Sequence, residues 1–304
     1  MQELNERGHL LTEQANPHSQ NLDQLSSLEL VALFNQEDAN AVAAVAAAQG
    51  SLAAAIEQTA SALRQGGRLF YIGAGTSGRL GVLDAAECPP TFCTDPEQVQ
   101  GIIAGGAGAL VRSSEDLEDR AADGAEAIAH RHITNLDVVV GITAGGTTPY
   151  VHGALQAARQ RGATTVFIAC VPAEQVPAQV DIDIRLLVGP EILAGSTRLK
   201  AGTATKLALN ILSTGVMVQL GKVYGNRMVD VAVTNRKLHD RALRILSDLT
   251  DLDREAAAYL LEQSGRKVKL ALLMHWTGLG KEEGDRLLAE HQGNLRRATL
   301  SYRA

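Results

Sequence analysis

The order of hydrophobic and polar positions predicts alternating strands and helices through the middle of the chain. Short apolar runs bounded by glycine or polar residues predict strands at 68–72, 101–104, 137–142, 164–169 and 184–188. Apolar residues at helical spacing predict helices at 77–87, 117–130, 150–161 and 203–220. Because this alternation is typical of βαβ units, we expect an α/β fold: a doubly wound, flavodoxin-like sheet of five parallel strands flanked by helices.

The two ends of the chain carry helical patterns without such strands. Residues 35–64 are rich in alanine, and Gly50 interrupts them, which predicts two helices or one broken helix. After residue 229, four more helical patterns follow, at 236–249, 254–263, 267–276 and 281–290. We therefore expect an N-terminal arm at 1–34, an α/β domain at 35–240 and a small helical domain at 241–304.

Composition narrows the class of protein. A chain of 304 residues, 45% apolar, buries a sizeable core without disulfides, and its 3 cysteines form neither a disulfide framework nor a C-x-x-C pair. The start has no leader pattern and no apolar run reaches the length of a membrane span, so we expect a soluble cytoplasmic protein with no membrane partner. A net charge of -6 and 3% aromatic residues argue against nucleic acid as a partner.

Two glycine- and hydroxyl-rich loops follow predicted strands, where ligands of parallel sheets bind. The first, 73–78, matches the dinucleotide fingerprint G-x-G-x-x-G, but the expected acidic residue after the second strand is replaced by Gly105-Gly106-Ala107. The second, 143–149, has similar chemistry and also precedes a helix. Two such loops favour one small phosphate over a pyrophosphate; the alternative is that both are only helix caps.

Three longer stretches carry a specific resemblance. Residues 80–90 (LGVLDAAECPP), 189–206 (GPEILAGSTRLKAGTATK) and 228–238 (MVDVAVTNRKL) resemble the N-acetylmuramic acid 6-phosphate etherase family, a branch of the sugar isomerase (SIS) fold, and the similarity extends from about Leu11 to the helical tail. That family cleaves the ether between the sugar C3 oxygen and D-lactate, in amino sugar catabolism and peptidoglycan recycling. The related glucokinase regulatory protein carries two SIS units, and 304 residues have room for one.

The resemblance implies a lyase that needs no metal and no organic cofactor, only a base for the C2 proton and an acid for the departing lactate oxygen. Glu87 matches the family's catalytic acid in D-A-[SA]-E-C-P-P. We expect Pro89 and Pro90 to end its helix, so that the helix dipole and partial burial favour a protonated carboxyl; an ordinary surface charge is the alternative. The family's E-x-x-E-D motif places the base at Glu118, with Glu115 as the alternative.

The resemblance and the two loops together give the expected substrate- and phosphate-binding residues: Gly75, Thr76, Ser77, Gly78, Thr143, Gly145, Gly146, Thr147, Thr148, Glu191, Ser196, Arg198 and Lys200. Arg198 and Lys200 are candidates to meet the lactyl carboxylate or the phosphate, helix capping and structural ion pairs being the alternative. The chain departs from the family's A-S-G-R-T, since Gly145 and Thr147 replace the serine and the arginine. Hydroxyls of Thr143 and Thr147 are the expected substitutes.

The SIS resemblance also implies a homodimer with sites near its interface. The apolar helix at 203–220 is either part of that interface or a core helix. Besides the etherase, two other functions fit the loops: a phosphosugar-binding regulatory protein without turnover, and an SIS isomerase. Retention of both carboxylates favours the etherase over a sensor, which needs no acid and base.

Overall fold

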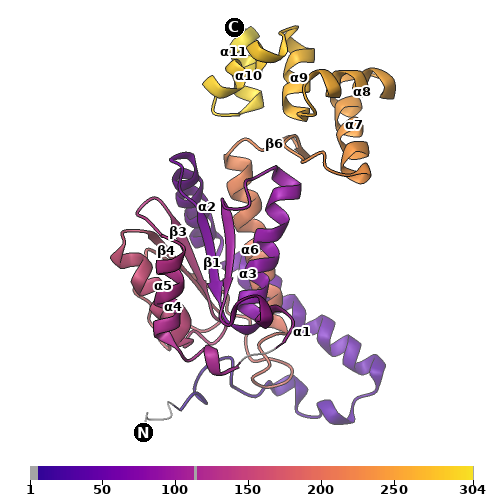
Figure 1. The fold of residues 1–304 in the computed structure, drawn as a ribbon. Helices are drawn as coiled ribbons and strands as arrows, with labels where there is room; N and C mark the ends of the chain where they lie inside the picture. Colours follow the sequence, from indigo (N-terminus) through magenta and orange to yellow (C-terminus); the bar gives the residue numbers. More distant parts are fainter. Residues whose placement is uncertain (1–5, 113–114, 304) are drawn as a thin grey trace. The chain divides into compact units, whose positions relative to one another are not determined.

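The computed structural model describes residues 6–112 and 115–303 (Figure 1). The chain divides into two compact units. The α/β unit comprises residues up to 86 and 97–213; the helical unit comprises 87–96 and the residues from 214 onward. The helical unit thus begins before residue 241, the position that the sequence suggested, and it takes in a short internal segment.

A five-stranded sheet forms the centre of the α/β unit. Its strands are β1 (Leu69–Gly73), β2 (Val99–Ile103), β3 (Val138–Ile142), β4 (Thr164–Ala169) and β5 (Ile182–Arg185). They lie in the order β2-β1-β3-β4-β5 with every neighbouring pair parallel, which confirms the flavodoxin-like sheet. Strand β5 ends before the predicted residue 188, because Val188 N–H donates to Leu186 O (2.9 Å) in a tight turn that leaves the sheet.

Helices cover both faces of this sheet (Figure 1). They are α1 (Ser27–Ala47), α2 (Gln49–Arg64), α3 (Gly75–Phe92), α4 (Ala121–His130), α5 (Pro149–Gln160) and α6 (Lys200–Gln219), and the short 3-10 turns are Pro17–Ser19, Leu22–Gln24, Gly106–Leu110 and Glu115–Leu117. The break between α1 and α2 is at Ala48, two residues before Gly50. Within the described ranges, no single helix is long and apolar enough to cross a membrane, and α1 with α2 meets that test only as a pair bent by 57°.

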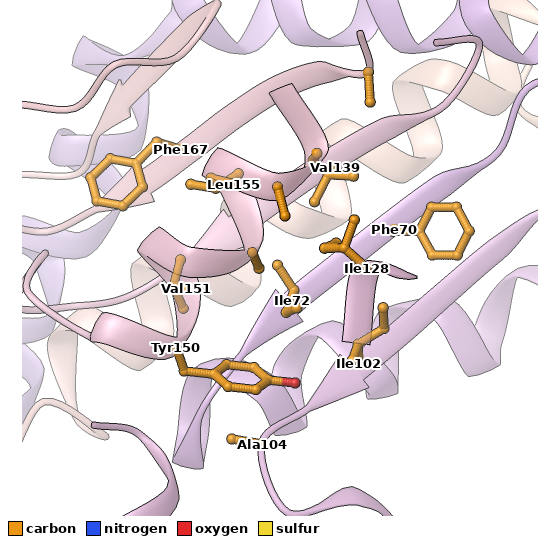
Figure 2. Packing of buried hydrophobic residues seen from close by; sticks show 14 of the residues in the cluster. Phe70, Ile72, Ile102, Ala104, Ile128, Val139, Tyr150, Val151, Leu155 and Phe167 are labelled. Atoms are coloured by element: carbon orange, nitrogen blue, oxygen red, sulfur yellow. The ribbon is translucent and has the colours of Figure 1, made fainter. Parts of the chain in front are cut away.

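The main core lies between the sheet and helices α4 and α5 (Figure 2). Phe70 and Ile72 of β1 point to this side, as alternate residues of a strand do, and pack with Val151 and Leu155 of α5. On the other side Tyr71 faces α3, where a Cβ on Gly81 would lie 2.8 Å from the Cβ of Tyr71. Burial of both faces explains why the strands read as continuous apolar runs.

The helical unit has a core of its own, built from residues after 228. It contains a hairpin of β6 (Val223–Tyr224) and β7 (Arg227–Met228), followed by α7 (Arg236–Thr250), α8 (Arg254–Gln263), α9 (Val268–Thr277), α10 (Lys281–Glu290) and α11 (Leu295–Arg303). The four predicted tail helices are confirmed. The sequence did not predict the hairpin, because its two-residue strands are too short to show an alternation of apolar and polar residues. It did not predict α11 either, because that helix has few apolar residues.

Helices α4 and α5 approach each other backbone to backbone through glycines. A Cβ on Gly153 would lie 2.1 Å from Ala121 O, and one on Gly124 would lie 1.9 Å from Tyr150 O. Both distances are far below a van der Waals contact, and backbone atoms cannot swing aside. The pair of glycines therefore sets the spacing of these two helices.

Gly153→Ala is expected to lower the free energy of unfolding by about 1–3 kcal/mol, because the added methyl group overpacks the α4–α5 contact. The matched control is Gly50→Ala in α2, where an added Cβ meets nothing within 4 Å. We expect no loss there and a gain of up to about 1 kcal/mol from helix propensity. Urea unfolding followed by circular dichroism measures both, and equal effects of the two variants would contradict the prediction.

Candidate functional site

A cavity of about 250 Å³ opens in the α/β unit at the carboxyl ends of β1 and β3. Several predicted binding residues line it, as does the predicted base: Gly75, Thr76, Ser77, Glu118, Thr143, Gly145, Thr147 and Thr148. The remaining lining residues are Arg7, Leu10, Glu13, Ala74, Leu80, Ala144, Gly195, Thr197, Ala201, Gly202 and Thr205. The structure thus brings both predicted loops and one predicted carboxylate to a single site.

The first loop turns directly from β1 into α3. Gly75 has a left-handed φ of +53° and is the first residue of α3, so Thr76 and Ser77 lie in the first helical turn. A Cβ on Gly78 would be 2.7 Å from Gly73 O, which shows that Gly78 serves the tight turn; it does not line the cavity. The first turn of a helix carries backbone N–H groups without helical acceptors and the positive end of the dipole, a ready anion site.

The second loop turns from β3 into α5 in the same way. Gly146, with φ +76°, donates its N–H to Thr143 O (3.3 Å) and does not line the cavity. The hydroxyls of Thr143 and Thr148 are hydrogen-bonded to each other at 2.8 Å, and Thr148, the N-cap of α5, makes no side-chain cap bond. The N-terminus of α5 therefore adds the positive end of a second helix dipole beside a pair of hydroxyls.

Glu118 lies on the cavity wall in the loop before α4. We expected a helix from residue 117, but residues 115–117 form a 3-10 turn and α4 begins at Ala121. Tyr150 N–H donates to Glu118 O (3.0 Å), which fixes this loop to the start of α5. The side chain of Glu115, the alternative base, lies outside the described part of the structure.

Glu87 does not line this cavity and its side chain is exposed. Our expectation that the helix ends before Pro89 was wrong, because α3 continues to Phe92. The prolines remove two N–H donors, but Cys93 N–H still donates to Pro89 O (2.9 Å), and the helix stops only where Cys93 takes a φ of +50°. Neither the expected position at the helix end nor the expected partial burial of Glu87 is found.

The stretch 189–206 contributes to the cavity through different residues than we expected. Gly195 and Thr197 line it, whereas Glu191, Ser196, Arg198 and Lys200 do not. Glu191 is fully buried and accepts N–H bonds from Lys200 and Ala201 (2.9 Å each), so it caps the N-terminus of α6. Burial raises the pKa of Glu191 despite those two bonds. The alternative stated for this stretch therefore holds for both residues: Glu191 caps a helix, and Lys200 forms a structural ion pair.

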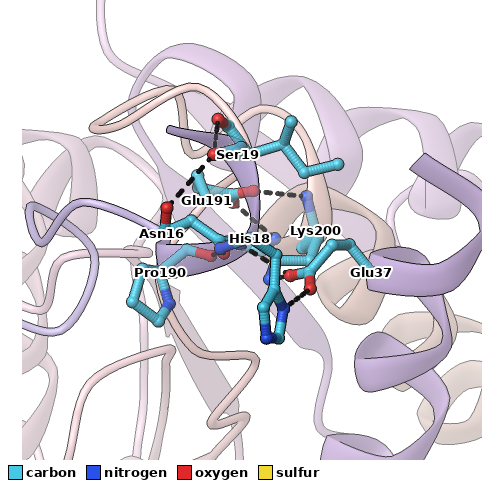
Figure 3. A network of polar contacts seen from close by, with 9 residues as sticks. Asn16, His18, Ser19, Glu37, Pro190, Glu191 and Lys200 are labelled. Atoms are coloured by element: carbon cyan, nitrogen blue, oxygen red, sulfur yellow. Dashed lines mark hydrogen bonds and ion pairs between the residues drawn. The ribbon is translucent and has the colours of Figure 1, made fainter. Parts of the chain in front are cut away.

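Lys200 belongs to a buried polar network around Glu37 (Figure 3). The Glu37 carboxylate accepts from Lys200 Nζ (2.6 Å) and Asn16 Nδ2 (2.7 Å), and lies 2.7 Å from His18 Nδ1. Burial alone would raise the pKa of Glu37, but the hydrogen bonds from Lys200, His18 and Asn16 outweigh it and hold the pKa at about 2. The network joins α1 and α6 to the arm before α1.

The N-terminal arm is the part of the site that our sequence reasoning missed. Arg7, Leu10 and Glu13 line the cavity, although they precede the predicted domain by more than twenty residues. The similarity that begins near Leu11 was the available signal, since a solvated tail has no need of a specific sequence. Among the residues that the structure describes, no group of three or more His, Cys, Asp or Glu is placed to hold a metal ion.

Curated relatives match the chain over its whole length. It is 80% identical to an N-acetylmuramic acid 6-phosphate etherase of Nostoc punctiforme over 302 residues, covering 99% of this chain and 98% of that one. The corresponding protein of Trichormus variabilis is 80% identical, covering 100% and 99%, and that of Rippkaea orientalis is 75% identical with the same coverage. The chain belongs to the N-acetylmuramic acid 6-phosphate etherase family.

Three family models match parts of this etherase family member. The SIS domain model matches residues 120–215, the N-terminal SIS domain of glucokinase regulatory protein matches 51–159, and the C-terminal lid domain of that regulatory protein matches 225–272. A phosphoheptose isomerase from Francisella tularensis is 16% identical with a TM-score of 0.47, covering 64% of this chain and 100% of that one.

Lys200→Met is expected to lower the free energy of unfolding by about 3–5 kcal/mol at pH 7, because it leaves the Glu37 carboxylate buried without its cation. The pKa of Glu37 is held at about 2, below its ordinary 4.5, so its contribution is present above pH 4.5 and is lost as the pH falls toward 2. The cost of Lys200→Met should therefore shrink toward low pH in urea unfolding.

The control for this variant is Lys267→Met, which removes a lysine whose side chain is 59% exposed and pairs with Asp285 at 3.2 Å. A solvated pair of this kind contributes about 0–1 kcal/mol, with little change over the same pH range. A Lys200→Met variant as stable as this control would show that the buried pair does not hold the arm.

Proposed function

We propose that the protein cleaves the C3 D-lactyl ether of N-acetylmuramic acid 6-phosphate with water, giving N-acetylglucosamine 6-phosphate and D-lactate. Membership of the etherase family at 80% identity supports this reaction, which is that of a carbon-oxygen lyase in amino sugar catabolism and peptidoglycan recycling. The structural observation that carries it is one cavity with two helix N-termini for a phosphate and Glu118 on its wall. A purely regulatory role has no comparable support, because a sensor needs no base.

The phosphate end of the substrate fits the two loops. The first turn of α3 supplies backbone N–H groups, and α5 adds the positive end of its helix dipole. Hydroxyls on the cavity wall come from Thr76, Ser77, Thr143, Thr147 and Thr148. This arrangement dispenses with the serine and arginine of the family's A-S-G-R-T. We propose that the hydroxyls of Thr143 and Thr147 take over those contacts.

The sugar reacts as its open-chain aldehyde, in which the carbonyl acidifies the C2 proton. We propose that Glu118 removes this proton, the C3–O bond breaks, and the lactate oxygen leaves with a proton from an acid, forming a C2=C3 double bond. Water then adds: its hydroxyl goes to C3 and a proton returns to C2. The proton balance needs only a base and an acid, and Glu87, through its motif, is the proposed acid.

We also propose that the protein is a homodimer. Leu28, Val31 and Val42 are 80%, 58% and 62% exposed on α1, and their spacing puts them on one stripe of that helix, which runs out from the sheet in Figure 1. A stripe of this kind is typical of a protein interface. Helix α6 corresponds to the helix at 203–220, which the sequence left open as an interface helix or a core helix; it buries Ala204, Ala208, Leu209 and Leu212 and is mainly a core helix.

The proposed compartment is the cytoplasm. In the described part of the chain, Cys88, Cys93 and Cys170 form no disulfide, and burial raises the pKa of Cys170 to about 12, which keeps that thiol protonated. Reduced cysteines of this kind suit a reducing compartment.

Glu118→Gln is expected to lower kcat by about 10²–10⁴-fold while the variant still binds the substrate, because it removes the base and keeps the side-chain shape. Glu87→Gln should have the same effect. The measurement is enzymatic detection of released D-lactate, and Glu126→Gln, an exposed glutamate of α4, is the matched control. If the wild type binds the substrate and releases no lactate, the proposed function is wrong; if Glu115→Gln alone loses activity, the base is Glu115.

The double variant Leu28→Glu, Val31→Glu is expected to sediment as a monomer of 32.1 kDa, whereas the wild type sediments at twice that mass. Two carboxylates on the apolar stripe of α1 would have to be buried without partners in the proposed interface. Tyr259→Glu changes a side chain that is 69% exposed in the helical unit and serves as the control. A monomeric wild type would overturn the dimer.

A further inference from the structure

The charges around the cavity leave one part of the substrate without a counterpart. The proposed substrate carries two anionic groups, a phosphate and a lactyl carboxylate. The helix N-termini that follow the two loops suit the phosphate, but two of the charged side chains on the cavity wall, Glu13 and Glu118, repel a carboxylate. Of the lining residues within the described ranges, Arg7 alone is a lysine or arginine.

Arg7 lies on the side of the cavity where the chemistry takes place. Its Nη2 is 4.0 Å from Oδ1 of Asp119, the residue that follows Glu118. A base that removes the C2 proton must lie beside C2, and the lactyl group is attached to the neighbouring carbon, C3. Arg7 is therefore near the C2–C3 end of a bound substrate.

The arm holds the backbone of Arg7 while its side chain keeps its freedom. Leu10 N–H donates to Arg7 O (2.9 Å), and the Leu10 side chain is 2% exposed in the main core. Gln175 secures the next turn: its Oε1 accepts from Leu11 N–H at 3.0 Å and its Nε2 donates to His9 O at 3.1 Å.

The ion pair of Arg7 is weak enough to be exchanged for a ligand. The side chains of Arg7 and Asp119 are 47% and 67% exposed, and a solvated pair at 4.0 Å contributes little. A guanidinium, by contrast, binds a carboxylate through two parallel N–H bonds. A substrate carboxylate can thus replace the long contact to Asp119 at small cost.

We propose that Arg7 binds the lactyl carboxylate and is the residue that distinguishes the substrate from the product sugar. This inference rests on the proposed function, because it takes the lactyl sugar phosphate as the ligand. Binding of the lactyl carboxylate was expected from Arg198 or Lys200, and the proposal assigns it to a residue of the arm instead. Neither Arg198 nor Lys200 lines the cavity, and Lys200 is bound to Glu37.

The test compares two sugar phosphates that differ only in the lactyl group. Calorimetry measures binding of N-acetylmuramic acid 6-phosphate and N-acetylglucosamine 6-phosphate to the Glu118→Gln chain, which binds without turnover, with and without Arg7→Gln. We expect Arg7→Gln to weaken binding of the muramic compound by about 10- to 100-fold and binding of the glucosamine compound by less than about 2-fold, as loss of a charged hydrogen-bonded contact predicts. The affinity of Arg7→Lys for the muramic compound should lie between those of Arg7 and Arg7→Gln.

Arg120→Gln is the matched control. It removes the same charge from a nearby arginine whose side chain is 58% exposed and pairs with Asp123 at 3.8 Å, and which does not line the cavity. This variant should leave both affinities unchanged. In an otherwise wild-type chain, Arg7→Gln should raise KM for the muramic compound with a smaller effect on kcat.

Equal weakening of the two sugar phosphates would overturn the proposal, because Arg7 would then bind the phosphate or only support the fold. Unchanged affinities would overturn it as well. Failure of the proposed function would give a different result. The chain with Glu118 and Arg7 intact would release no D-lactate, whatever effect the variants of Arg7 have on binding.

Discussion

The site depends on two helices that begin at the same edge of a parallel sheet. Strands β1 and β3 are neighbours, so the turns that follow them bring the N-termini of α3 and α5 to one cavity. Parallel strands impose this convergence, because every strand ends at the same edge. The protein thus gathers positive potential from backbone dipoles, and a chain with a net charge of -6 binds an anion without a basic surface.

Local signals predicted the fold and the loops well. Apolar runs in a sheet buried on both faces, and glycines where the chain must turn left-handed, are properties of a few adjacent residues, and they located β1, β3, Gly75 and the second loop. The block at 189–206 was identified correctly but its roles were not, because Glu191 and Lys200 are polar residues whose partners lie at the N-terminus of α6 and on α1. No local pattern distinguishes a buried cap from a ligand contact.

The N-terminal arm also shows why local sequence patterns could not identify every residue of the site. Arg7 and Glu13 reach the cavity only because Leu10 is buried in the core and Asn16 meets Glu37 more than twenty residues later. Each of these contacts is long-range, so spacing in the sequence carries no trace of them. Pro89 and Pro90 misled the prediction for a related reason: proline weakens a helix by a fixed local cost, and the surrounding structure decides whether the helix continues.

The division of the chain into units bears on how such proteins are recombined. The helical unit is made from two separate pieces of sequence, and Ala232 N–H donates to Pro90 O across them, so the short piece at 87–96 belongs structurally with the tail. A chimera that exchanges only the tail between relatives would pair a new tail with an old segment carrying the D-A-A-E-C-P-P motif. Exchange of the whole helical unit therefore needs three crossovers, before residue 87, after residue 96 and after residue 213. The proposed acid, Glu87, would then move with the tail rather than with the sheet.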